Sequence, residues 1–394
     1  RHHDRSMKKE RIFGTDGVRG IPGQYPLLPG MISGMAYLAA RLLMRKGRVH
    51  VNGTAPAVLM ARDTRGSGPR LCRDLVKGFS AAGARTIDLG VAPTPAVAYL
   101  TPRLGALCGV VVSASHNPAQ FNGIKFFTGD GYKMTPELED LIEKDLAAVC
   151  SAGLPSLPAA RGRVFREDGS RRLSDYVDFL RSTFPAMTDL GGMKLVVDCA
   201  HGAASRIAPA LLESLGAKVV AIGCRPDGRN INERRGALHP AEMSRIVVQE
   251  GADAGICLDG DADRCLFSDE KGRLLDGDAL ICLSAMHLLE RGLLRSNKVV
   301  LTVMSNLGLI RFLRTHGVSV VSVPVGDRNV TEAIDKESLS LGGENSGHII
   351  FRSFASTGDG LLTALQTLAA LKASGKPLSW HRRSYHATPQ IINN

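Results

Sequence analysis

The segment GVVVSASHNPAQFNGIKFF, residues 109–127, holds side chains that could perform covalent chemistry. An apolar, β-branched run ends there in a polar stretch that Pro118 stiffens. We expect an exposed loop on which the hydroxyl of Ser115 serves as a nucleophile or a phosphate carrier. The alternative is an ordinary turn whose serine and asparagine side chains bond their own backbone. The polar side chains that this loop brings together are Ser113, Ser115, His116 and Asn117.

Lys125 follows in the same segment, inside the apolar frame GIKFF. Burial among apolar side chains disfavours the charged ammonium group and therefore lowers the pKa of a lysine. We expect Lys125 to have a lowered pKa and to take part in proton transfer.

The segment LDGDADR, residues 258–264, places three aspartates, Asp259, Asp261 and Asp263, after an apolar run. Carboxylates that close repel one another strongly unless a cation neutralises them. A set of oxygen ligands without cysteine or histidine favours Mg²⁺ or Ca²⁺ over zinc. The spacing also opens a calcium EF-hand loop, but the glycine that such a loop requires is not at its offset. The segment therefore predicts a magnesium site with positions left for phosphate oxygens, and a solvated acidic turn is the alternative.

Three further glycine-rich loops have side chains suited to anions or hydroxyl groups. Arginine beside glycine-exposed backbone amides suits phosphate oxygens, and a carboxylate near an amide and a hydroxyl suits the vicinal hydroxyls of a sugar. The alternative for the two loops with arginine is a structural turn with arginines at the surface. The alternative for the third loop is a hairpin turn that explains its glycines. The side chains are Thr15, Asp16 and Arg19 in FGTDGVRG, Arg62, Arg65 and Ser67 in ARDTRGSG, and Glu344, Asn345, Ser346 and His348 in GGENSGHII.

The elements that position these loops alternate between short β-branched runs and helical periodicity. This pattern predicts an α/β fold with mixed, mainly parallel sheets, whose ligands bind beyond the carboxyl ends of the strands. We expect helices at 136–148, from residue 278 onward, and at the end of the chain up to about residue 375. Strands are expected at 57–61, 109–114, 194–200, 217–223, 298–304 and 318–325.

In this order, FGTDGVRG, SASHNPAQFNGIKFF, DGDADR and GENSGHI closely resemble motifs of the α-D-phosphohexomutase family, over residues 12 to about 372. The resemblance implies that Ser115 is phosphorylated and, together with Asp259, Asp261 and Asp263, holds one Mg²⁺. Proton transfer and charge stabilisation would then fall to Arg19, His116, Lys125 and Arg264. Sugar binding would fall to Glu344, Ser346 and His348, with Asp327 and Arg328 of the GDR loop beside the sugar.

The resemblance implies a mutase that transfers phosphate on a small sugar phosphate. The first motif and VVVSASHNP are most similar to the branch that interconverts glucosamine 6-phosphate and glucosamine 1-phosphate on the route to cell-wall precursors. Glucosamine 1,6-bisphosphate is then expected as the intermediate and activator. A phosphomannomutase or phosphoglucomutase, and a truncated remnant that binds sugar phosphates without turnover, are the alternatives.

The resemblance also implies three consecutive α/β domains. We expect residues 7–160 to carry the phosphoserine loop, 161–266 the metal loop and 267–380 the sugar loop, with a linker at 151–163 and a hinge at 381–394. The family's fourth domain, with its RPSGT-like phosphate loop, is expected to be absent, since no such stretch occurs in this sequence. The fourth domain then lies outside this chain, or the protein is a naturally shortened form.

Composition narrows the class of protein. A chain of 394 residues with 44% hydrophobic residues can form several cores. Residues 1–6 resemble a purification-tag remnant, and no apolar run is long enough for a membrane span or signal peptide, so we expect a cytoplasmic protein with no membrane partner. The eight scattered cysteines indicate small buried residues in a reducing compartment.

The net charge of +11 is compatible with nucleic acid, an anionic surface or a phosphorylated substrate. Aromatic residues make up 5% of the chain, and no basic run is interleaved with them, so we expect no nucleic-acid partner. A homodimer is one assembly compatible with the sequence.

Overall fold

The computed structural model describes residues 11–46, 55–151 and 166–390, with the side chains of 147–151 excepted. Its strands are β1 Val18–Gly20, β2 Ala57–Arg62, β3 Arg85–Val91, β4 Cys108–Val112, β5 Asn122–Thr128, β6 Arg166–Asp168, β7 Lys194–Asp198, β8 Lys218–Ile222, β9 Ala254–Leu258, β10 Cys265–Asp269, β11 Leu274–Leu275, β12 Lys298–Thr302, β13 Ser319–Val323, β14 Leu341–Gly343 and β15 Ile349–Phe351.

Its helices are α1 Pro29–Lys46, α2 Gly68–Ala81, α3 Thr94–Arg103, α4 Pro136–Ser151, α5 Leu173–Ser182, α6 Ile207–Ser214, α7 Ala241–Glu250, α8 Gly277–Glu290, α9 Leu307–Thr315, α10 Asp327–Lys336, α11 Gly360–Ser374 and α12 Leu378–His381. Short 3₁₀ helices cover Ser170–Arg172, Gly236–Leu238 and Arg295–Asn297. No helix within the described ranges is long and apolar enough to cross a membrane.

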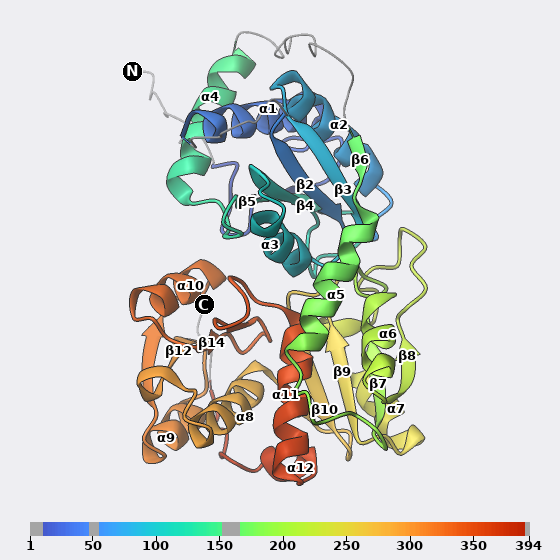
Figure 1. Ribbon diagram of the computed structural model, residues 1–394, viewed down its shortest axis with the longest axis vertical. Coiled ribbons are helices and arrows are strands. Elements are labelled where there is room, and N and C mark those ends of the chain that lie inside the picture. The colour runs from blue at the N-terminus through green and yellow to red at the C-terminus, as the bar shows by residue number, and fades with distance from the viewer. Residues whose placement is uncertain (1–10, 47–54, 152–165, 391–394) are drawn as a thin grey trace, which may run out of the picture.

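Three sheets define three units. Unit I has the strand order β1-β5-β4-β2-β3-β6, unit II the order β11-β10-β9-β7-β8 and unit III the order β13-β12-β14-β15. Unit I lies above units II and III, which stand side by side (Figure 1). Parallel pairs join β4, β2, β3 and β6 in unit I, β9, β7 and β8 in unit II, and β13, β12 and β14 in unit III. Antiparallel pairs add β1, β5, β10, β11 and β15. The predicted α/β fold with mixed, mainly parallel sheets is confirmed.

The expected elements form close to their predicted positions, because their local patterns are strong. The central strand β4 is buried along all its residues, as its continuous apolar run requires. The helix expected from residue 278 begins at 277, and the helix expected to end near 375 ends at 374. The predicted linker 151–163 lies almost wholly outside the described residues, and the predicted boundary between 266 and 267 falls inside β10.

A shared hydrophobic core extends through all three units. Its residues come from β2, β3 and α3 of unit I, from α5, and from the sheets of units II and III. Helix α11 contributes residues from nearly its whole circumference, because it lies between the sheet of unit II and α8 (Figure 1). Six of the cysteines are buried core residues and Cys224 is half-buried; these seven, whose side chains the structure describes, are free thiols.

Candidate active site

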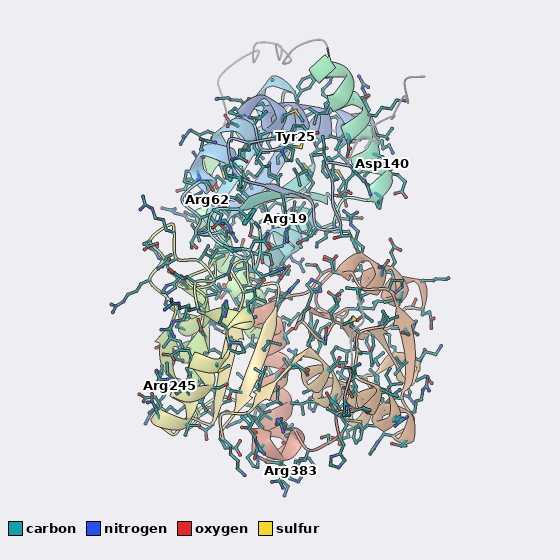
Figure 2. The ribbon with its side chains drawn as sticks, turned by 180° about the vertical axis from the view of Figure 1, so that it is seen from behind. Arg19, Tyr25, Arg62, Asp140, Arg245 and Arg383 are labelled. Atoms are coloured by element: carbon teal, nitrogen blue, oxygen red, sulfur yellow. The ribbon has the colours of Figure 1, made fainter. Side chains whose placement is uncertain are left out.

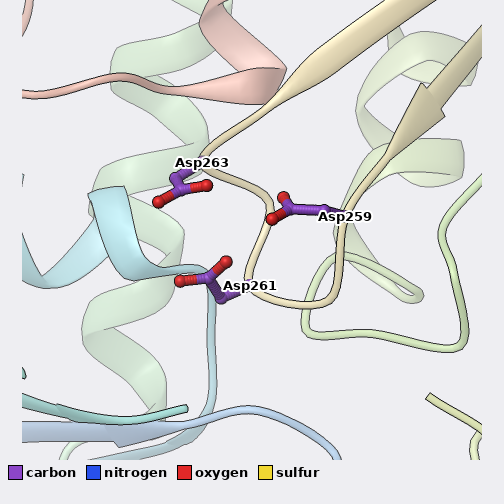
Figure 3. A group of neighbouring side chains, drawn as sticks. All are labelled: Asp259, Asp261 and Asp263. Atoms are coloured by element: carbon purple, nitrogen blue, oxygen red, sulfur yellow. The ribbon is translucent and has the colours of Figure 1, made fainter. Parts of the chain in front are cut away.

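The three predicted metal ligands lie together on the loop between β9 and β10. This loop connects two antiparallel strands, and it turns the carboxylates of Asp259, Asp261 and Asp263 toward one another (Figure 3). One carboxylate oxygen from each lies within 4.8 Å of the others, and all three residues are buried. Among the described residues, Oδ1 of Asp261 and Oδ1 of Asp263 are buried without a hydrogen-bond partner. Unpaired, buried oxygen ligands in this arrangement fit a hard divalent cation.

The electrostatics of Asp259 and Asp261 differ. Burial raises the pKa of Asp259 well above its usual value, and the charges of Asp263 and Asp261 raise it further. Burial would raise the pKa of Asp261 too, but Nζ of Lys125 at 2.9 Å and the hydroxyl of Thr94 at 2.6 Å lower it below its usual value. Thr94 opens α3, and its backbone N–H also donates to the carbonyl of Asp261, so the helix N-terminus favours this anion.

Ser115 faces this metal loop. Its Oγ donates to Oδ2 of Asp259 at 2.7 Å, and its backbone has a φ of 50°, in the left-handed region. Such strained backbone persists only where the surroundings impose it, which is common at functional sites. The expectation of an exposed serine is wrong, because Ser115 is 1% exposed. Unit II covers the loop, and the side-chain amide of Asn232 donates to the carbonyl of Ser115 at 2.8 Å.

Arg65 holds the Ser115 loop in place. Its guanidinium donates to the carbonyls of Ser115 at 3.1 Å, Asn117 at 2.8 Å and Phe121 at 2.9 Å, and also to that of Pro118. Its Nε donates to Asp63, and the hydroxyl of Ser113 donates to the same carboxylate at 2.6 Å. The expectation that Arg65 binds phosphate oxygens or lies at the surface is wrong, because Arg65 is 1% exposed and its donors are occupied by Asp63 and the serine loop.

Lys125 lies between carboxylates from two units. Burial would lower the pKa of this lysine, but Asp16, Asp261 and Asp263 raise it above its usual value. The prediction of a lowered pKa is therefore wrong. The sequence pattern GIKFF shows the apolar neighbours of Lys125 but not the carboxylates, which lie 2.9 Å (Asp261) and 3.3 Å (Asp16) from its Nζ. Lys125 is a charged donor in this structure.

The first glycine-rich loop supplies Asp16 and Arg19. Burial would raise the pKa of Asp16, but Lys125, Lys133 and Arg19 lower it well below its usual value. Arg19 bonds Asp16 and keeps a buried Nε that has no partner among the described residues. It lies near the level where unit I meets the other two units (Figure 2).

His116 and Arg264 flank the serine and the metal loop. Nδ1 of His116 is 3.4 Å from Oγ of Ser115, and burial together with the charges of Arg264 and Arg19 lowers its pKa to about 4. Its imidazole is therefore neutral at neutral pH and can accept a proton. The carboxylates of Asp263 and Asp259 raise the pKa of Arg264 above its usual value against the effect of burial, and its Nε is buried without a partner in the part of the chain that the structure describes.

The predicted sugar loop is the turn between β14 and β15. Glu344 and His348 are buried, and Oε1 of Glu344 accepts the backbone N–H of Gly326 at 3.1 Å. Within the described residues, Oγ of Ser346 and both ring nitrogens of His348 are buried without hydrogen-bond partners. Unsatisfied polar atoms are costly to bury, so these groups are consistent with a polar ligand.

The two residues predicted from the GDR loop already have partners in unit I. Asp327 bonds Nζ of Lys133, and Arg328 bonds both carboxylate oxygens of Glu139, at 3.0 Å for Oε2. The hydroxyl of Ser356 donates to the carbonyl of Gly131 at 2.7 Å in the same contact between units I and III. Arg328 is thus an inter-unit residue in this structure.

Several site residues were not predicted from the sequence. Asp63 follows β2 and Thr94 follows β3, so the rule that ligand sites lie at the carboxyl ends of parallel strands would have found them. Asn232 and Lys133 lie outside the predicted motifs and carry no such signal.

Comparison with known proteins identifies the family. The model of phosphoglucomutase/phosphomannomutase alpha/beta/alpha domain I matches residues 10–151, that of domain II matches 174–272 and that of domain III matches 276–387. The chain belongs to the α-D-phosphohexomutase family. The resemblance inferred from the motifs is thereby confirmed.

Relatives of this phosphohexomutase include curated phosphoglucosamine mutases. Those of Cereibacter sphaeroides (strain ATCC 17025 / ATH 2.4.3) and Rhodospirillum rubrum are both 46% identical, over 386 and 396 residues, with 98% of this chain and 84% of theirs covered. The expectation of a mutase is confirmed: the chain is an isomerase-class enzyme that interconverts sugar phosphates.

Solved structures share the fold. A phosphoglucomutase/phosphomannomutase family protein from Burkholderia thailandensis superposes with a TM-score of 0.80 at 24% identity, covering 97% of this chain and 80% of that one. A putative phosphomannomutase from Thermus thermophilus gives 0.79 at 23% identity, covering 94% and 82%.

Proposed function

We propose that this phosphohexomutase interconverts glucosamine 6-phosphate and glucosamine 1-phosphate through a phosphorylated Ser115. The observation that supports this most directly is the 2.7 Å contact between Oγ of Ser115 and Asp259 of the buried triad. A hydroxyl that can carry phosphate then lies at the edge of a candidate cation site. The identity of the sugar rests on the relatives, which are named phosphoglucosamine mutases.

Asp259, Asp261, Asp263 and the Ser115 oxygen are the groups that would hold Mg²⁺. When bound, the cation would supply positive charge that offsets the charge of the transferring phosphoryl group. The fit rests on the all-oxygen ligand set and on the two unpaired buried oxygens described above.

The first transfer breaks the P–O bond at Oγ of Ser115 and forms a P–O bond to the free hydroxyl of the bound sugar monophosphate. The hydroxyl loses its proton and Oγ of Ser115 gains one, so charge and protons balance. His116, with a neutral imidazole 3.4 Å from Oγ, can hydrogen-bond the serine oxygen, and charged Lys125 can stabilise the negative charge that develops during the transfer.

The product of this step is glucosamine 1,6-bisphosphate, which reverses its orientation and returns its other phosphate to Ser115. Glu344, Ser346 and His348 would bind the sugar hydroxyls in both orientations. We further assign the serine loop to unit I, the metal loop to unit II and the sugar loop to unit III, in a cytoplasmic enzyme.

The test is intact mass and phosphopeptide mapping before and after incubation with glucosamine 1,6-bisphosphate and Mg²⁺. We expect one added phosphoryl group, located on Ser115, and mutase turnover with glucosamine phosphates that exceeds turnover with mannose or glucose phosphates. Ser115→Ala should abolish both phosphorylation and turnover, whereas exposed Ser170→Ala should change neither. An active Ser115→Ala enzyme would refute the route.

A further inference from the structure

Asp327 lies next to two other candidate sugar-binding residues, Glu344 and His348. It opens α10 directly after Gly326, whose N–H bonds Glu344, and its Oδ2 lies 3.8 Å from Nε2 of His348. The carboxylate is therefore a neighbour of two residues assigned to the sugar hydroxyls. It is also mostly buried, with 14% of its side chain exposed.

The carboxylate of Asp327 already binds a primary ammonium group, that of Lys133 from unit I. Lys133 is held by two carboxylates at once, since its Nζ also lies 2.7 Å from Oδ1 of Asp16. If Asp327 exchanges Lys133 for another cation, Lys133 keeps Asp16 as its partner. Neither buried charge is then left unpaired, which is the condition under which such an exchange costs little.

There is room for this exchange. Lys133 and Asp327 both line a cavity of about 340 Å³ between units I and III. Its other lining residues include neutral polar and charged side chains: Ser356, Thr357, Arg328, Asp130, Glu332 and Asp335. A shift of the Lys133 side chain into this space that keeps the 2.7 Å contact with Asp16 would free the carboxylate of Asp327.

We propose that Asp327 binds the C2 ammonium group of an amino-sugar phosphate and thereby selects it over hexose phosphates that carry a hydroxyl at C2. This inference rests on the proposed function and deepens it, because it names the residue that distinguishes the sugar. A charge-assisted hydrogen bond between a carboxylate and an ammonium is about twice as strong as one to a neutral hydroxyl. The neighbouring Glu344 and His348 then bind hydroxyl groups of the same ring.

Binding calorimetry with glucosamine 6-phosphate and glucose 6-phosphate tests this on the wild-type protein, on Asp327→Asn and on Glu332→Gln. We expect the wild type to prefer glucosamine 6-phosphate. Asp327→Asn should weaken that affinity at least about thirtyfold, because it removes one partner of a buried charge pair, and leave the affinity for glucose 6-phosphate nearly unchanged. Glu332→Gln is the matched control, since Glu332 is an exposed carboxylate on the same helix and the same cavity.

Equal wild-type affinities for the two sugars would overturn the proposal. So would an equal loss for both sugars in Asp327→Asn, which would make Asp327 a positioning residue. If Asp327→Asn melts far below the wild type, the affinity of the wild-type protein for N-acetylglucosamine 6-phosphate is measured instead. The amide of this sugar carries no charge, so the sugar should bind as weakly as glucose 6-phosphate. Phosphorylation of Ser115 is measured separately, so the mutase function can stand while this inference fails.

Discussion

Asp259 and Asp261 of the metal loop differ in their hydrogen-bond partners and in the pKa of their carboxylates. Oδ2 of Asp261 accepts bonds from Thr94 and Lys125, while its Oδ1 is buried and unpaired, so one carboxylate both orders its surroundings and offers a free ligand atom. Asp259 has no lysine beside it among the described residues, and its raised pKa reflects that difference. Asp261 therefore belongs both to the candidate cation site and to the hydrogen-bond network of Lys125.

Asp261→Asn should weaken Mg²⁺ binding at least about tenfold, which is the loss that removing even an outer partner of a metal ligand causes. Since ligand binding stabilises the folded state by mass action, the wild-type melting temperature should rise with added Mg²⁺ and that of the variant should rise much less. Asp253→Asn, an exposed aspartate just before β9, is the control. An unchanged Mg²⁺ response in Asp261→Asn would argue against the triad as the metal site.

The hydrogen bonds of Arg65 lead to a second prediction about a single residue. Arg65→Lys keeps the charge, but one ammonium group cannot reach the four carbonyls and Asp63 that the guanidinium joins. Each buried acceptor left unpaired is costly, so the free energy of unfolding should fall by at least about 2 kcal/mol. Urea denaturation measures this, with Arg73→Lys on the exposed face of α2 as the control. Equal stability of the two variants would contradict the structural role.

At the scale of elements, the N-terminus of α11 joins the core to the metal loop. Asp359 caps this helix through the N–H of Leu362 and accepts the hydroxyl of Tyr176 from α5, while the N–H of Gly360 donates to the carbonyl of Ala262 in the metal loop. Burial raises the pKa of Asp359 to about 6. The N-terminus of α11 therefore carries a carboxylate that takes up a proton at a higher pH than an ordinary aspartate does.

This raised pKa predicts a pH dependence of stability. Because the folded pKa exceeds the unfolded value of about 3.9, Asp359 favours the folded state most below pH 4, and this contribution is lost as pH rises through 6. The loss amounts to about 3 kcal/mol. Asp359→Asn retains a cap but cannot ionise, so the wild type should lose stability relative to it between pH 4 and 7. Urea unfolding across this range, with exposed Asp175→Asn as control, measures the difference; a constant difference would contradict it.

Local patterns explain which elements the sequence could predict. The buried strands β4, β7 and β12 are continuous β-branched runs, and the turns after them carry distinctive polar residues, so the strand, the loop and its chemistry were visible together. The burial of Ser115 was not visible. It depends on Asn232 and Gly260, which lie more than a hundred residues away and meet the serine loop only after units I and II pack.

At the scale of the whole molecule, a line of alternating charges crosses all three units. Asp327 of unit III pairs with Lys133, Lys133 with Asp16, Asp16 with Lys125, and Lys125 with Asp261 of unit II. Each member owes its shifted pKa to partners from another segment of the chain, which is why the local sequence pattern predicted the wrong direction for Lys125. The site is therefore a property of the assembled units, and its residues cannot be assigned roles from one motif at a time.

The pair Arg328 and Glu139 offers a test of that assembly. The sequence assigns Arg328 to the substrate, whereas the structure bonds it to Glu139 of unit I, with 18% and 3% of the two side chains exposed. If the pair joins the units, Arg328→Gln and Glu139→Gln should lower stability by similar amounts. The double variant should then lose little more than either one, with a coupling of about 1–3 kcal/mol.

Sugar-phosphate affinity separates the two roles, since an inter-unit pair predicts equal weakening in both single variants, whereas a substrate-binding arginine predicts weakening only in Arg328→Gln. The exposed pair Arg85 and Glu167 is the control, and its coupling should stay below about 1 kcal/mol because solvent screens it. Calorimetry and urea unfolding on the same variants supply both readouts. A coupling energy as small as that of the control pair, together with a loss of sugar-phosphate affinity in Arg328→Gln alone, would indicate that Arg328 binds the substrate. Units I and III would then be joined through Lys133 and its two carboxylates.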